Sequence, residues 1–238
     1  MPVTLRRHLR TVKVDGKRVV PFSGKREGII AGRKLITRGT RRIKSYSSDA
    51  ERAVLGAITA QRAFGVRKNR VGLRRELSYS NFFIDEKKAM SVLETKFGNN
   101  EIKARNAWLK GDTFGGSVHP VKQISENIIK RRLGLALAAE AGKAGAGRKS
   151  IPIRNVVLDN VTHSWIVESV VKRLTRGMRG AAPKMKGLPK ETTGLKIHFE
   201  KQPSGRFRVK MSYEEFSGDV TKNFKECMLP SLKKYLVD

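Results

Sequence analysis

Apolar residues recur at helical spacing in several separate segments of the chain. The longest such segment spans residues 120–141, where Val121, Ile124, Ile128 and Leu133 share one face and Pro120 stands at the first turn. Shorter segments with the same period predict helices over 48–65, 85–97, 101–110 and 162–176, and a last one over 220–236 that Pro230 kinks or divides. Ser48 and Glu51 have the spacing of a capping box at the start of the 48–65 helix.

Two segments alternate in the manner of strands. Residues 11–22 place short β-branched runs on either side of Asp15-Gly16, which predicts a hairpin. A second hairpin is predicted over 195–216, with its turn at Pro203-Ser204-Gly205. Helices and hairpins together favour an α+β fold. We expect residues 47–238 to form one core domain, preceded by residues 1–46 as a hairpin and an extended arm, since glycines interrupt the stretch 23–46.

Charge dominates the composition. The 238 residues include 51 Lys and Arg against 21 Asp and Glu, which gives a net charge of +30, and residues 1–75 hold 21 basic against 4 acidic residues. A folded chain with this imbalance repels itself unless an anionic partner lies close, and nucleic acid is the commonest such partner. We therefore expect contacts with DNA or RNA backbone, or with an acidic partner, at Lys25, Arg26, Arg33, Lys34, Arg38, Arg41, Arg42, Lys44, Arg67, Lys68, Arg70, Arg74, Arg75, Arg148 and Lys149.

Catalytic and cofactor motifs are not evident in the sequence. The glycine loop at 142–150 nearly matches a phosphate-binding loop, but a predicted helix precedes it and Ile151-Pro152 follows, where such a loop needs a strand before it and a helix after it. The four histidines, at positions 8, 119, 163 and 198, lack metal-ligand spacing, and the single Cys227 excludes an internal disulfide. These observations predict no enzyme activity, no metal and no cofactor.

Aromatic residues also argue against base recognition. Phe22, Phe64, Phe82, Phe83, Phe97 and Trp165 occupy positions typical of a core and are not interleaved with the basic runs. Phe199, Phe207 and Tyr213 of the second predicted hairpin are assigned to core packing as well. We therefore expect backbone contact that ignores base sequence.

The stretch 142–177 resembles tailed-phage neck and tail-completion proteins. The resemblance rests on a glycine-rich loop, on Ile151, Pro152 and Arg154 in an Ile-Pro-x-Arg pattern, and on the amphipathic helix that contains Trp165. It implies a non-enzymatic virion protein that forms a ring at the head–tail junction, with these three residues at a subunit contact. Its partners would be further copies of the chain, neighbouring assembly proteins and nucleic acid.

Two alternatives remain open at this stage. The first is a ribosomal or ribonucleoprotein component, and the second is a viral nucleoprotein that coats a genome. The sequence has no apolar run of about 18 residues, so no membrane partner is expected. The expected location is a virion or host cytoplasm, with a ribonucleoprotein particle as the alternative.

Overall fold

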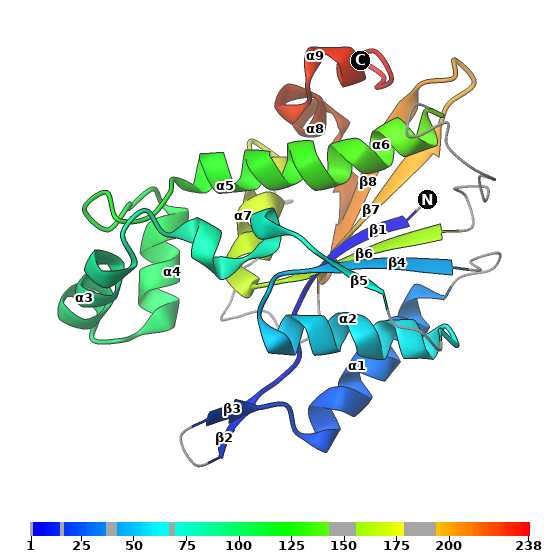
Figure 1. Cartoon of the computed structure of the whole chain (residues 1–238). Coiled ribbons are helices and arrows are strands. Elements are labelled where there is room, and N and C mark those ends of the chain that lie inside the picture. The colour runs from blue at the N-terminus through cyan, green and yellow to red at the C-terminus, as the bar shows by residue number, and fades with distance from the viewer. Residues whose placement is uncertain (1, 15–16, 37–41, 67–69, 143–155, 179–193) are drawn as a thin grey trace.

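The computed structural model describes residues 2–14, 17–36, 42–66, 70–142, 156–178 and 194–238. Within these residues the chain is organised around a twisted sheet of seven strands in the order β5-β4-β6-β1-β7-β8-β9 (Figure 1). The strands are β1 (Pro2–Arg7), β4 (Arg42–Ser47), β5 (Val71–Leu73), β6 (Val156–Thr162), β7 (Gly194–Lys201), β8 (Phe207–Tyr213) and β9 (Phe216–Asp219). A class that mixes α and β elements is thereby confirmed.

The sheet has a parallel half and an antiparallel half. Strands β5, β4, β6 and β1 run parallel, while β7 pairs antiparallel with β1 and continues through β8 to β9. In the register of β1 against β6, Leu5 lies opposite Asn160 and Arg7 opposite Thr162. The carboxyl ends of four parallel strands therefore meet at one edge, which is where open sheets of this kind bind ligands.

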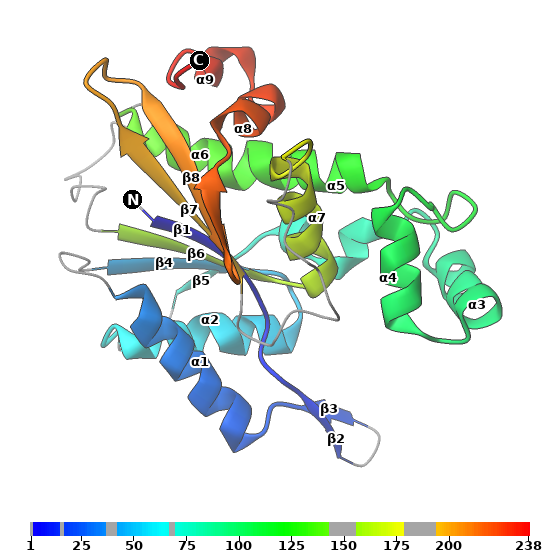
Figure 2. The same cartoon turned by 180° about the vertical axis from the view of Figure 1, so that it is seen from behind.

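Helices cover the two faces of the sheet differently. Figure 2 shows α1 (Phe22–Leu35) and α2 (Glu51–Ala63) on one face, with α5 (Val121–Ile128), α6 (Gly134–Glu140) and α7 (Ser164–Leu174) on the other. Alternation along β1 matches this arrangement, because Val3 and Leu5 enter the main apolar core on the α7 side. Arg6, the residue after Leu5, points to the other face, where its Nη2 donates to the carbonyl of Gly56 in α2.

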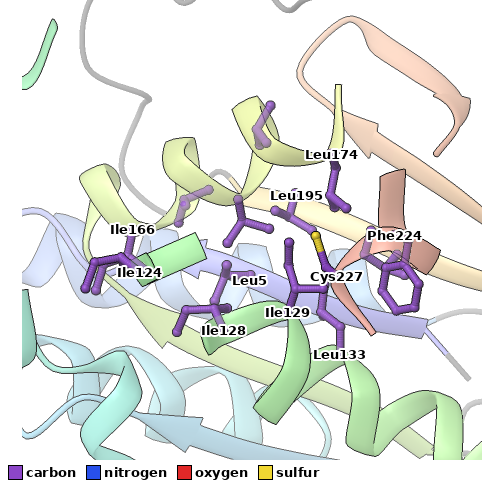
Figure 3. Close-up of a cluster of buried hydrophobic side chains, with 14 of the residues drawn as sticks. Leu5, Ile124, Ile128, Ile129, Leu133, Ile166, Leu174, Leu195, Phe224 and Cys227 are labelled. Atoms are coloured by element: carbon purple, nitrogen blue, oxygen red, sulfur yellow. The ribbon is translucent and has the colours of Figure 1, made fainter. Parts of the chain in front are cut away.

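The main core lies between the sheet and the α5–α7 layer. Figure 3 shows Leu5 and Leu195 from the sheet meeting Ile128, Ile129 and Leu133 from the helices. Phe224 and Cys227 of α8 (Thr221–Cys227) close the same cluster. The Cys227 thiol is buried, and burial raises its pKa.

Helix α1 corrects the expectation of an extended arm. Residues 22–35 are helical, and Gly24, Gly28 and Gly32 lie buried on one side of the helix. A Cβ on Gly32 would lie 2.7 Å from the Cα of Ala60, so the glycines permit close packing of α1 against α2. Spaced glycines break a helix in isolation, but here tertiary packing requires them. The proposed boundary at residue 46 falls inside β4.

Most of the other predicted elements are present. The helix predicted over 85–97 corresponds to α3 (Glu86–Phe97), and the one over 101–110 corresponds to α4 (Glu101–Leu109). The long helix predicted over 120–141 corresponds to α5, a π-helical segment η3 (Ile129–Leu133) and α6. The hairpins appear as β2 (Val12–Val14) with β3 (Lys17–Val19), and as β7 with β8. The last predicted helix is divided at Pro230, because α8 ends at Cys227 and Pro230 begins a separate helix, α9 (Pro230–Lys233).

The capping box predicted at Ser48 is wrong. Helix α2 begins at Glu51 with Ala50 at its N-cap, and no side chain makes a cap hydrogen bond. Ser48 is buried, and its backbone N–H donates to the carbonyl of Val161 instead. The residue therefore belongs to the sheet edge at the end of β4. No helix among the described residues has both the length and the apolar content to cross a membrane.

Candidate active site

Two histidines meet where the two central parallel strands end. His8 follows β1 and His163 follows β6, and the N–H of His8 donates to the carbonyl of Thr162 at 2.9 Å. Their imidazole rings lie edge to face with centroids 5.3 Å apart. Although 155 positions separate them in sequence, the parallel pairing of β1 with β6 places them side by side.

Hydrogen bonding sets the tautomer that His8 favours. Its Nδ1 lies 2.9 Å from the carbonyl oxygen of Leu9, which can only accept, so Nδ1 carries the proton. Burial, reinforced by the positive charge of Arg52, lowers the pKa of His8 to about 3. At neutral pH the ring is therefore uncharged, and its Nε2 keeps a free electron pair.

His163 is held in a similar state. Burial and the charge of Arg52 lower its pKa to about 4. The side chain is 6% exposed, and its Nε2 has no hydrogen-bond partner among the described residues. A buried polar atom without a partner costs free energy, so this nitrogen is suited to a ligand that offers one.

A cavity of about 560 Å³ opens onto this pair. Arg7, His8, Arg52 and His163 contribute two guanidinium groups and two imidazoles to its lining. Arg52 comes from the first turn of α2, which packs against β4 and β6 and so brings this cation to the strand ends. The remaining lining residues are Leu9, Thr11, Val12, Tyr79, Phe83, Glu86, Met90, Leu93, Glu101, Ser164 and Trp165.

The cavity lining also includes two carboxylates and an apolar wall. Glu86 and Glu101 begin helices α3 and α4, and both side chains are exposed. They lie close enough to Tyr79 for their charges to contribute to its raised pKa, after the larger effect of burial. Phe83, Met90 and Leu93 provide apolar surface beside them. Arginine side chains can bind an anion such as a phosphate dianion, and carboxylates can exchange protons with a bound group.

Two buried ion pairs brace the strands and helices around the cavity. Arg6 of β1 pairs with Asp159 of β6 through two contacts of 2.7 Å, and both side chains are almost fully buried. Arg105 of α4 pairs with Glu168 of α7 at 2.9 Å, with both side chains fully buried. Burial raises the pKa of Glu168 to about 7, while the Arg105 guanidinium opposes this shift.

The basic residues predicted to bind a partner lie elsewhere. Those that the structure describes are exposed: Lys25, Arg26, Arg33 and Lys34 on α1, Arg42 and Lys44 on β4, and Arg70, Arg74 and Arg75 around β5. None of these nine lines the cavity at His8. The remaining predicted residues, Arg38, Arg41, Arg67, Lys68, Arg148, Lys149, Ile151, Pro152 and Arg154, lie outside the described residues.

The sequence interpretation missed the cavity residues because it treated the histidines as scattered. A usable signal exists: His8 and His163 each follow directly on a strand-like segment, PVTLRR in one case and VVLDNVT in the other. Two histidines at the ends of two buried strands would have suggested a shared sheet edge. No group of three or more potential metal ligands is found within the described residues.

The fold is similar to that of several solved bacterial proteins. Mycobacterial glucosyl-3-phosphoglycerate phosphatase matches with a TM-score of 0.56 and 17% identity, over 91% of this chain and 99% of that chain. Mycobacterial hydrolase 2 matches at 0.55 and 17% identity, over 95% of each chain. Bacillus stearothermophilus YhfR matches at 0.52 and 12% identity, over 92% of this chain and 98% of that chain. This chain shares the fold of these solved structures.

Sequence comparison alone gives no such link. No protein-family model matches the chain, and no curated protein sequence is significantly similar to it. The structural likeness, at these identities, is a likeness of fold.

The resemblance to tailed-phage neck and tail-completion proteins is wrong. The chain shares its fold with a named phosphatase and a named hydrolase, and this finding overturns the prediction of a non-enzymatic virion junction protein and its ribonucleoprotein alternative. The predicted helix after the glycine loop does exist, as α7, but it follows β6 of a parallel sheet. The motif was too short to separate the two folds. The predicted locations, and the contacts with further copies of the chain, stay predictions.

Proposed function

We propose that the chain is a phosphomonoester hydrolase that works through a phosphohistidine at His8. The observation that carries this proposal is the arrangement of His8, His163, Arg7 and Arg52 in one cavity at the carboxyl ends of β1 and β6. Two structures of one neighbour support it by their titles: that neighbour is a glucosyl-3-phosphoglycerate phosphatase, and it has been solved with inorganic phosphate.

Each cavity residue has a distinct part in the proposed reaction. Arg7 and Arg52 bind the phosphoryl oxygens and offset the charge that develops on them. His163 presents its buried Nε2 to one of these oxygens, and binding the anion favours the protonated, donating form of the ring. Burial keeps His8 neutral, so its Nε2 can attack phosphorus without first losing a proton.

The reaction then proceeds in two steps. In the first, a bond forms from His8 Nε2 to phosphorus, the ester P–O bond breaks, and a carboxylic acid gives its proton to the departing oxygen. In the second, water attacks phosphorus, the N–P bond breaks, and the carboxylate recovers a proton from that water. Glu86 and Glu101 are the carboxylates that line the cavity and are assigned to this exchange.

The test is phosphate release from p-nitrophenyl phosphate by the wild-type chain and by His8→Asn. Loss of the nucleophile is expected to lower kcat/KM by about 10³-fold or more, because the proposed reaction assigns the attack on phosphorus to His8. His198→Asn is the matched control, since His198 is exposed on β7 and does not line the cavity. Quenching the wild-type reaction should also trap an acid-labile, base-stable phosphoryl label that His8→Asn lacks. Wild-type rates in His8→Asn would overturn the proposal.

A further inference from the structure

Helix α1 carries a surplus of positive charge that the proposed reaction does not use. Lys25, Arg26, Arg33 and Lys34 are exposed, and the helix contains one acidic residue, the half-buried Glu27. None of the four cations forms an ion pair with a residue that the structure describes. Fourteen helical residues extend over about 21 Å at 1.5 Å per residue, so these charges form a track and not a point.

This track begins beside the candidate active site. Lys25 lines a second cavity of about 500 Å³, together with Val19, Val20 and Leu55. Thr11 and Arg52 line both this cavity and the cavity at His8, so the two are adjacent. A chain of phosphates that entered at His8 could therefore continue past Arg52 and Lys25 onto α1.

An exposed aromatic residue stands at the start of the track. Phe22, the first residue of α1, is 83% exposed, so its assignment to the core was wrong. Arg26 and Arg33 follow it by four and eleven residues, which puts the three side chains on one stripe of the helix. An aromatic face beside cations is the combination that binds an unpaired base and its backbone phosphate together.

We propose that α1 and the cavity beside it guide the phosphorylated end of a single-stranded polynucleotide to His8. The terminal phosphate binds between Arg7 and Arg52, the next backbone phosphates follow Lys25, Arg26 and Arg33, and a base stacks on Phe22. The polynucleotide is a substrate in this proposal, which rests on the proposed phosphatase function. A single strand fits better than a duplex, because the bases of a duplex are stacked on each other and cannot reach Phe22.

The experiment compares phosphate release from a 5′- or 3′-phosphorylated 12-nucleotide DNA or RNA strand with release from the corresponding mononucleotide. The KM for the better strand is expected to be at least about tenfold lower at 50 mM salt. The double variant Arg26→Glu/Arg33→Glu should remove most of this preference and leave kinetics on p-nitrophenyl phosphate unchanged. For the strand, a plot of log KM against log salt concentration should have a slope that is shallower by about 1.4 in this variant. That is about 0.7 for each lost phosphate contact. Phe22→Ala should raise the KM for the strand by about tenfold.

A matched variant controls for net charge. Lys222→Glu/Lys234→Glu lowers the charge by the same amount at α8 and just after α9, which lie at the opposite end of the molecule from α1 (Figure 1). This variant is expected to keep the preference for the strand. Equal losses in the two double variants, or equal KM values for strand and mononucleotide, would overturn the proposal.

The design separates this proposal from the function on which it rests. Binding of an unphosphorylated fluorescent strand, followed by anisotropy, tests the track without catalysis. If no phosphomonoester is hydrolysed, the phosphatase function fails, whether or not the strand binds. If p-nitrophenyl phosphate is hydrolysed through His8 but the strand does not bind, only the present proposal fails. If the protein sediments with phosphatidylserine vesicles and shows no preference for the strand over the mononucleotide, the track belongs to a membrane-binding surface instead.

Discussion

The ring of His8 meets the ring of His163 edge to face, with centroids 5.3 Å apart, at the ends of two strands that run parallel. Neither residue would have this neighbour without the β1–β6 pairing. The contact therefore makes the chemistry of the cavity depend on the middle of the sheet, and several expectations follow from that dependence.

Replacement of His163 by Asn should damage catalysis more than stability. The side chain offers its Nε2 to the cavity and makes no hydrogen bond through that atom within the described residues. We expect kcat/KM for p-nitrophenyl phosphate to fall about 10²-fold, as is usual when one oxyanion donor is removed, with Tm within a few degrees of wild type. Steady-state kinetics and calorimetry check the two parts. A large loss of Tm with an unchanged rate per folded molecule would assign His163 to packing alone.

Acid should destabilise the chain through the same two histidines. Their folded pKa values are lowered to about 3 and about 4, whereas the unfolded chain binds protons near pH 6.5. Above pH 6.5 both rings are neutral in either state and contribute no pH dependence. As pH falls below 6.5, the two histidines bind protons in the unfolded state but stay neutral in the folded state. The free energy of unfolding should then fall by about 1.4 kcal/mol per pH unit for each histidine, down to about pH 4.

The contribution of one histidine can be isolated by difference. Glu168 works in the opposite direction between pH 4.5 and about 7, because burial raises its pKa and the folded state there holds the extra proton. Urea titrations of wild type and His8→Asn, compared at each pH, cancel this and other shared terms. The difference curve should have the slope of one proton between pH 6 and pH 4. A flat difference curve would mean that His8 is protonated normally in the folded chain.

The sequence predicts the locally encoded parts of this fold well. Helix α3 is an example, since Asp85 accepts a hydrogen bond from the N–H of Lys88 and Gly98 ends the helix with a left-handed conformation. Both signals lie within three residues of the helix ends. The hairpin of β7 with β8 and the division of the last helix at Pro230 are local in the same sense.

The parts that the sequence did not predict depend on distant residues. Gly28 and Gly32 look like breaks in a basic arm until Thr59 and Ala60 of α2 are placed against them. Similarly, His8 looks like an isolated surface histidine until β6 brings His163 to its side. The cavity is formed by strand order, and strand order is not visible in the spacing of residues along one segment.

The buried pair of Arg6 and Asp159 should be essential to the strand pair that carries the two histidines. Asp159 is fully buried and also accepts a hydrogen bond from Thr4 Oγ1 at 2.9 Å. Asp159→Asn leaves the Arg6 guanidinium buried without its countercharge, which should lower the free energy of unfolding by about 3–5 kcal/mol.

Two further variants make this prediction specific. Arg6→Met/Asp159→Leu removes both charges and should recover much of the loss. Asp238→Asn, which breaks exposed pairs with Arg206 and Lys225, should cost far less than Asp159→Asn because water screens these charges. Urea denaturation measures all three. A loss at Asp159→Asn no larger than at Asp238→Asn would contradict the assignment of Arg6 and Asp159 as a brace.

A last prediction concerns Gly28, which connects α1 to His8, the proposed nucleophile. A Cβ at Gly28 would lie 2.2 Å from Thr59 Oγ1 and 2.8 Å from Leu9 Cδ2, and the carbonyl of Leu9 accepts the hydrogen bond from His8 Nδ1. Gly28→Ala should therefore destabilise the chain by about 1–3 kcal/mol through overpacking, and should also lower kcat as Leu9 shifts.

Gly56 of α2 provides the matched control for this change. A Cβ there would meet the Cγ of the same Leu9 at 3.4 Å, an ordinary contact, so Gly56→Ala should be neutral or stabilise the helix by up to about 1 kcal/mol. Gly28→Ala/Thr59→Ala removes the hydroxyl that the new methyl group meets, and should recover part of the stability while the contact with Leu9 persists. If the double variant also recovered full kcat, the effect on catalysis would pass through Thr59, and Leu9 would not be the connection between α1 and His8.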